Sequence, residues 1–204
     1  MKTLTKIIKQ HNLCISKNPL GITRSWPNSF IDEFYNKFCH GLFLYKKSPC
    51  ILEINQENKN NIRLWELYFE KIKVDNFFIN PTNQNNFSLL KNYDLIIFNQ
   101  FETFYRVSFF LKISKSLTYK GVLIIENVTN NISVRYLIKL FIFSFYKYDL
   151  ELYDFRLKNF INSNTLLVIR KKHNHDLAKK IYFLLNLFKF SSINLIIWII
   201  KFFY

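Results

Sequence analysis

Glycine, proline and cysteine are scarce in this sequence of 204 residues, which contains 3 Gly, 4 Pro and 3 Cys. The cysteines (Cys14, Cys39 and Cys50) are isolated from one another. An odd number of isolated cysteines indicates neither a disulfide framework nor a structural zinc site, so we expect a reducing, cytoplasmic setting. No uninterrupted apolar core follows the charged residues 1–6, and we therefore expect no secretory signal.

Acidic residues are also few. The chain has 29 Lys and Arg against 14 Asp and Glu, a formal net charge of +15. Proteins that read nucleic acid usually gather basic residues on one face, whereas here the lysines are spread along the chain. We therefore expect no specific nucleic-acid partner. Two interpretations remain for the charge: a solvated surface biased by base composition, or attraction to anionic lipid or polymer.

Hydrophobic residues make up 50% of the chain, including 23 Phe and 12 Tyr, enough for one sizeable domain. Residues 49–81 organise it. They predict a buried strand at 50–54, a polar loop, a helix at 61–72 capped by Asn60 or Asn61, and a strand at 74–79. Such a βαβ unit has parallel strands and a right-handed crossover. Ligands bind beyond the carboxyl ends of such strands, which places the first candidate site after Ile54.

The remaining elements extend this unit. We expect helices at 27–44, 103–117 and about 130–146, strands at 94–99 and 122–127, and a short amphipathic segment at Leu4, Ile7 and Ile8. Residues 149–155 and 165–170 are joined by a loop rather than a helix, which predicts an antiparallel pair. The predicted fold is α/β: a Rossmann-like three-layer sandwich with a mostly parallel sheet that ends in an antiparallel strand pair.

The C-terminal segment 176–204 is helical in pattern. One apolar stripe contains Ile181, Leu184, Leu185 and Phe188, a second lies within 193–200, and lysines flank both. Its longest clean run is short for a membrane crossing. Two interpretations remain: an interfacial helix in peripheral contact with the inner face of a membrane, or a helix that packs on the domain or forms a homodimer surface. We divide the chain into an extension (1–26), a domain (27–172) and a tail (173–204).

Several segments, taken in order, resemble the class I S-adenosylmethionine-dependent methyltransferases, in particular the macrocin-type sugar O-methyltransferase and cephalosporin-hydroxylase-like branch. The resemblance covers roughly residues 27–172, and its segments are ILEI at 51–54, LWELYF at 64–69, INP at 79–81, YDLII at 93–97, KGVLIIENV at 120–128, and DFR with LLVIRK at 154–156 and 166–171.

This resemblance implies S-adenosylmethionine as cofactor, held at the ends of the first three strands. The implied cofactor-binding residues are Glu53, Asn55, Asn58, Asn80 and Asn99. The sequence departs from the family in two places: the loop 55–61 has no Gly, and Phe78 stands where the family has a ribose-binding acid. Asn is the best substitute for Gly in a left-handed turn, but Phe accepts no hydrogen bond.

The resemblance also implies catalytic chemistry after the later strands. Glu126 and Asn127 match the family's Mg²⁺-binding positions, where carboxylates are the usual ligands. Glu102 stands where the family has a basic His, and burial that raised its pKa would suit it to act as a general base. Its alternative interpretation is an exposed acid at a helix N-terminus.

Two functions are consistent with these observations. The first is a divergent O-methyltransferase that acts on a hydroxyl of a sugar, glycan or other small molecule. The second is a non-catalytic relative that serves as a membrane-surface or partner-binding module, as the missing loop glycines, Phe78 and the basic, apolar tail suggest.

Overall fold

The computed structural model describes residues 3–13, 34–46, 48–54, 59–69, 71–79, 91–98, 107–126, 128, 134–144, 147–154, 165–171, 180–189 and 191–192. The strands are β1 (Cys50–Ile54), β2 (Lys73–Phe77), β3 (Tyr93–Phe98), β4 (Leu117–Glu126), β5 (Tyr148–Asp154) and β6 (Thr165–Lys171). The helices are α1 (Leu4–Gln10), α2 (Asn36–Tyr45), α3 (Lys59–Tyr68), α4 (Val107–Lys115), α5 (Val134–Ser144) and an unlabelled helix at 180–189.

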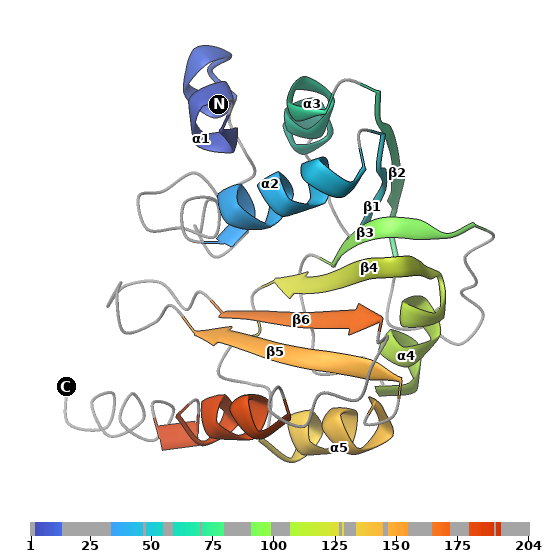
Figure 1. The fold of residues 1–204 in the computed structure, drawn as a ribbon, viewed down its shortest axis with the longest axis vertical. Helices are drawn as coiled ribbons and strands as arrows, with labels where there is room; N and C mark the ends of the chain where they lie inside the picture. Colours follow the sequence, from blue (N-terminus) through green and yellow to red (C-terminus); the bar gives the residue numbers. More distant parts are fainter. Residues whose placement is uncertain are drawn as a thin grey trace.

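The strands form one sheet in the order β2-β1-β3-β4-β6-β5 (Figure 1). β1 pairs in parallel with β2 and β3, and β3 in parallel with β4. β6 lies between β4 and β5 and is antiparallel to both. The predicted mostly parallel sheet ending in an antiparallel pair is therefore confirmed.

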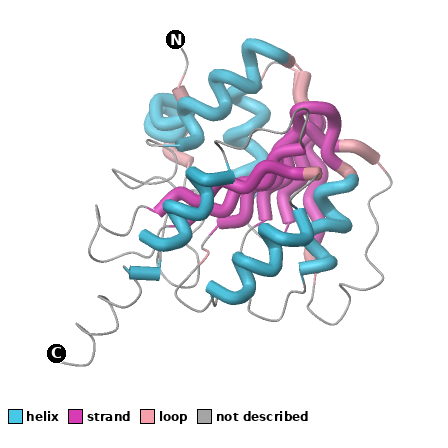
Figure 2. The backbone as a smooth tube through the Cα atoms, turned by 60° about the horizontal axis from the view of Figure 1, so that its bottom comes forward, coloured by secondary structure: helices cyan, strands magenta, loops and turns pink. Residues whose placement is uncertain are grey.

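Helices cover both faces of the sheet (Figure 2). One face, with Ile51, Leu95 and Ile97, packs against α1, α2 and α3. The other, with Leu52, Ile96 and Phe98, packs against α4, α5 and the helix at 180–189. Successive strand residues point to opposite faces, which explains why the central strands read as continuous apolar runs rather than alternating patterns.

The N-terminal segment joins the first of these layers. Leu4, Ile7 and Ile8 of α1 are buried against it, as their spacing predicted. The backbone N–H of Leu4 donates to Oδ1 of Asn36 at 3.0 Å, and Nδ2 of Asn36 donates to Oγ1 of Thr5 at 3.0 Å. One side chain at the start of α2 thus connects α1 to the domain.

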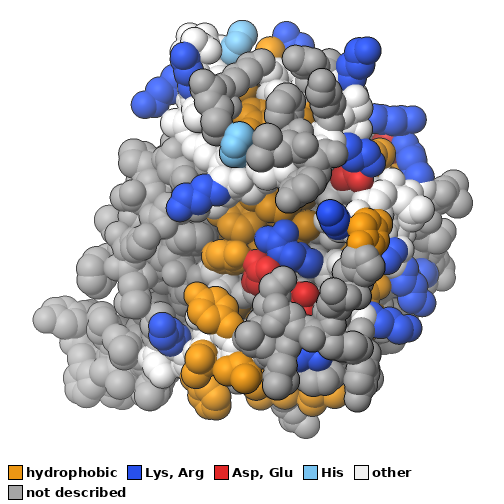
Figure 3. All heavy atoms as spheres, viewed as in Figure 1, with side chains coloured by type: hydrophobic (Ala, Val, Ile, Leu, Met, Phe, Trp, Pro, Cys, Tyr) orange, Lys and Arg blue, Asp and Glu red, His pale blue; other side chains and the backbone are white. Residues whose placement is uncertain are grey.

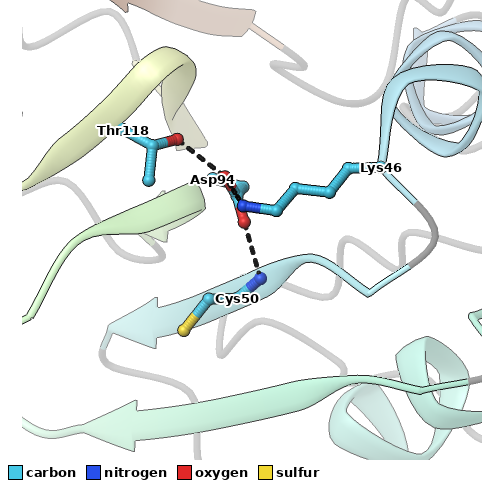
Figure 4. Close-up of polar contacts among 4 residues, drawn as sticks. All are labelled: Lys46, Cys50, Asp94 and Thr118. Atoms are coloured by element: carbon cyan, nitrogen blue, oxygen red, sulfur yellow. Dashed lines mark hydrogen bonds and ion pairs between the residues drawn. The ribbon is translucent and has the colours of Figure 1, made fainter.

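Asp94 joins three strands at their amino ends (Figure 4). Its Oδ1 accepts hydrogen bonds from Nζ of Lys46 at 2.8 Å and from Oγ1 of Thr118 at 2.7 Å. Its Oδ2 accepts one from the backbone N–H of Cys50 at 2.8 Å. A buried carboxylate requires such partners. These bonds give Asp94 a structural role at the edge opposite the carboxyl ends of β1 and β3.

β4 bulges beside this cluster. Its pairing with β3 moves from Tyr93–Leu117 to Leu95–Val122, and Lys120 takes a left-handed φ of 64°. A Cβ on Gly121 would lie 2.9 Å from the backbone N and O of Thr118 and from the backbone O of Tyr93. Only glycine fits this close backbone approach.

We expect Gly121→Ala to lower the free energy of unfolding by about 1–3 kcal/mol, because the atoms that the methyl group would meet are backbone atoms that cannot rotate away. Urea denaturation of the variant and the native chain measures this change in the free energy of unfolding. Gly41→Ala is the matched control: nothing lies within 4 Å of its added Cβ, and a helical Gly→Ala change should stabilise by about 0.5–1 kcal/mol. Equal stability of the two variants would contradict the packing argument.

Candidate functional site

The connections of the sheet define a crevice at the carboxyl ends of β1 and β3. These strands are neighbours, with Ile54 opposite Phe98. The chain after β1 continues to β2 on one side, whereas the chain after β3 continues to β4 on the other (Figure 1). In open α/β sheets, ligands bind at such a switch point.

Glu53 lies directly below this crevice, as the penultimate residue of β1. Its side chain is fully buried on the face covered by α3, and its Oε1 accepts a hydrogen bond from the indole Nε1–H of Trp65 at 2.6 Å. Trp65 lies on the inward face of α3, beside Leu64 and Tyr68. Because a buried carboxylate is costly without hydrogen bonds, α3 supplies a partner for the acid of the preceding strand.

Glu126, the last residue of β4, is held similarly. It is 1% exposed, and its Oε1 accepts a hydrogen bond from the Tyr35 hydroxyl at 2.7 Å. The rings of Tyr35 and Trp65 are 5.9 Å apart between centroids and tilted by 56°. Glu53, Trp65, Tyr35 and Glu126 therefore form one buried group, which we call the carboxylate–aromatic layer.

Asn61 lies beside this layer in the first turn of α3. It is fully buried, and within the part of the chain that the structure describes neither its amide oxygen nor its amide nitrogen makes a hydrogen bond. Buried polar groups in native structures rarely lack a hydrogen-bond partner. The N-terminus of a helix also attracts polar and anionic groups. The amide and the helix start thus suit a polar ligand at the end of β1.

Two of the residues implied by the resemblance fall within the described chain, and the carboxylate–aromatic layer brings both, Glu53 and Glu126, together. The other implied site residues lie outside the described residues: Asn55, Asn58, Asn80, Asn99, Glu102 and Asn127. Phe78 follows β2 with its side chain 62% exposed.

Sequence reasoning missed the three other residues that make this site. Nothing in the sequence pattern singles out Tyr35, Trp65 is one residue of the LWELYF segment, and Asn61 is expected as a helix cap. The helix begins at Lys59 instead, so Asn61 falls within the first turn and faces inward. The spacing of the residues could have predicted that Asn61 faces inward, because Asn61, Trp65 and Tyr68 follow one another at helical intervals.

The described residues contain no group of three or more His, Cys, Asp or Glu that could hold a metal ion. Oε1 of Glu126 accepts its hydrogen bond from a tyrosine hydroxyl. Within the described residues, the donors do not fit Mg²⁺, which prefers several hard oxygen ligands.

No protein-family model matches the sequence, and neither does any curated protein. Among solved structures, residues 942–1257 of StiE O-MT superpose with a TM-score of 0.50 at 13% identity, covering 76% of this chain and 80% of that one. The chain has the class I methyltransferase fold. The methyltransferase BpumL with SAH (10% identity, TM-score 0.47) covers 66% of this chain and 80% of its own.

Within this methyltransferase fold, the carboxylate–aromatic layer supports the floor of the crevice. Glu53 comes from β1 and Glu126 from β4, while their hydrogen-bond donors come from α3 and from Tyr35, the residue directly before α2. The layer therefore fixes the helices relative to the strand ends where the methyltransferase fold has its switch point.

We expect Tyr35→Phe to lower the free energy of unfolding by about 1–3 kcal/mol, because it removes a hydrogen bond to the buried Glu126 carboxylate. Tyr182→Phe is the matched control, since Tyr182 is exposed and its hydroxyl should be worth no more than about 0.5 kcal/mol. Chemical denaturation of both variants tests the layer, and a loss for Tyr35→Phe no larger than the control's would contradict its role.

Proposed function

We propose that this protein is an S-adenosylmethionine-dependent methyltransferase that acts on a hydroxyl of a sugar or other small molecule. The observation that carries the proposal is the buried Asn61 amide at the start of α3, where β1 ends in a class I methyltransferase fold. The name of StiE O-MT, an O-methyltransferase of similar fold, supports the same chemistry.

The residues present fit the cofactor at this edge. The Asn61 amide has both a donor and an acceptor, which suits an amino-acid or ribose moiety. Glu53 is held under the same strand end by Trp65. We assign the remaining contacts to Asn55 and Asn58 after β1, Asn80 after β2 and Asn99 after β3. Bound S-adenosylmethionine supplies an electrophilic methyl group on a sulfonium.

The chain's own part in catalysis is to orient and deprotonate the acceptor. Holding a hydroxyl oxygen in line with the methyl group removes much of the entropic cost of the reaction. Glu102, a few residues beyond β3, is the base that we assign to the hydroxyl proton. Mg²⁺ has no part in this proposal, because the described residues contain no group of three or more His, Cys, Asp or Glu that could hold it.

One observation favours a second candidate function, a methyltransferase-fold protein without turnover. Phe78 lies exposed just after β2, where the resemblance implies an acid that binds the ribose hydroxyls. Losing hydrogen bonds to a charged group costs about 1.5–3 kcal/mol each. A chain with this change could retain the scaffold as a membrane-surface or partner-binding module. The next two predictions separate the candidates.

Isothermal titration calorimetry with S-adenosylmethionine tests the cofactor site. We expect saturable binding by the native chain and binding about tenfold weaker for Asn61→Ala, as the loss of one buried hydrogen bond implies. Asn186→Ala, on the distant helix at 180–189, is the control and should bind as the native chain does. No heat of binding at millimolar cofactor would sink the proposal.

Release of S-adenosylhomocysteine in the presence of glycoside acceptors tests turnover. We expect Glu102→Gln to lower kcat by about 100-fold, the typical worth of a general base, and to leave cofactor affinity unchanged. Glu66→Gln is the matched control, an exposed acid on α3 paired with Arg63 at 3.4 Å, and should keep full activity. Cofactor binding without any release by the native chain would favour the non-catalytic candidate.

A further inference from the structure

Large exposed hydrophobic side chains gather on α5 and the helix at 180–189. We call them the apolar ridge, and its members are Ile138, Ile142, Ile181, Leu184, Leu185 and Phe188. Phe188 is 72% exposed and Ile142 is 62% exposed. Figure 3 shows hydrophobic side chains along the lower edge of the molecule, where these helices lie in Figure 1. Several large apolar side chains exposed on neighbouring helices are typical of an interaction site.

The ridge points away from the core. The helix at 180–189 is buried through Phe183 and Leu187 instead, and the Phe183 ring stacks on Phe141 of α5 with centroids 5.2 Å apart and planes 9° from parallel. This contact fixes the two helices against each other. The stripe Ile181, Leu184, Leu185 and Phe188, which the sequence pattern left open between membrane and domain, is the outward face of a helix that already packs on the domain.

The charge around the ridge has one sign. α4, α5 and the helix at 180–189 contain no Asp or Glu, and their exposed lysines are Lys112, Lys115, Lys139 and Lys189, whereas Lys180 is buried. Most of the described acids lie on strands instead, and among these Glu53, Asp75, Asp94, Glu126 and Glu151 accept hydrogen bonds from aromatic or basic side chains. Apolar side chains flanked by cations, on helices whose described residues include no acid, are typical of helices that bind anionic lipid.

We propose that the apolar ridge docks the protein on an anionic membrane surface, with its lysines at the level of the lipid headgroups. A second copy of the chain fits less well, because it would bring the same cations face to face. The sequence beyond the ridge continues as INLIIWIIKFFY at 193–204, without an acid. Among the described residues, no helix is long and apolar enough to cross a membrane. The inference does not depend on catalysis and stands beside the proposed function.

Flotation of the full-length chain with vesicles tests this proposal. The vesicles are pure phosphatidylcholine or phosphatidylcholine with about one third phosphatidylglycerol. We expect binding to the anionic vesicles, weakened by raised salt because the lysine contribution is screened. The double variant Leu185→Gln/Phe188→Gln should bind at least about tenfold more weakly, since it removes apolar area without changing charge.

Tyr119→Gln is the control, an exposed aromatic on β4, and should bind the vesicles as the native chain does. Circular dichroism verifies that each variant is folded, and the single variant Phe188→Gln replaces the double one if that unfolds. Absence of vesicle binding by the native chain, or equal binding by the ridge variant, overturns the proposal. A third outcome also overturns it: the native chain does not bind vesicles, sedimentation shows that it is a dimer, and the ridge variant is a monomer. That outcome would assign the ridge to a second copy of the chain.

Discussion

A largely parallel sheet that must be covered on both faces is the constraint on which this structure depends. β1, β3 and β4 are buried on each side, so helices from the whole chain are needed to cover them. α1 and the helix at 180–189, near the two ends of the sequence, belong to opposite layers. The same constraint leaves the strand ends as the place where polar groups can meet a ligand.

Two acids interrupt the apolar face beneath α3, and the way they are held connects fold to function. Glu53 and Glu126 accept hydrogen bonds from an indole and a phenol, donors that lower the cost of burying a carboxylate. Trp65 and Tyr35 thereby join α3 and α2 to the strands that border the crevice. In the proposed function, the contacts with the cofactor begin at Asn61, beside this layer.

The strands could be predicted because their apolar runs are long and separated by polar loops. The strand predicted at 94–99 is observed at Tyr93–Phe98, and the one predicted at 165–170 is observed at Thr165–Lys171. The hydrogen-bond donor to Glu53 could not be predicted, because the resemblance implies a cofactor contact there and the donor is a tryptophan twelve residues away on a helix. The outward orientation of the stripe Ile181, Leu184, Leu185 and Phe188 could not be predicted either. Phe183 and Leu187 form a second apolar face of the same helix, and periodicity does not say which of the two faces packs on the sheet. Asn55, Asn58, Asn80, Asn99, Glu102 and Asn127 stay predictions.

The central claim, that a class I methyltransferase fold here binds its cofactor at the carboxyl ends of β1 and β3, is tested most directly by hydrogen–deuterium exchange with and without S-adenosylmethionine. The account predicts slower exchange in peptides that cover residues 52–64 and 96–106, with the peptides of α5 and of 180–189 unchanged. Unaltered exchange at the strand ends under saturating cofactor, or protection confined to another part of the chain, would contradict it.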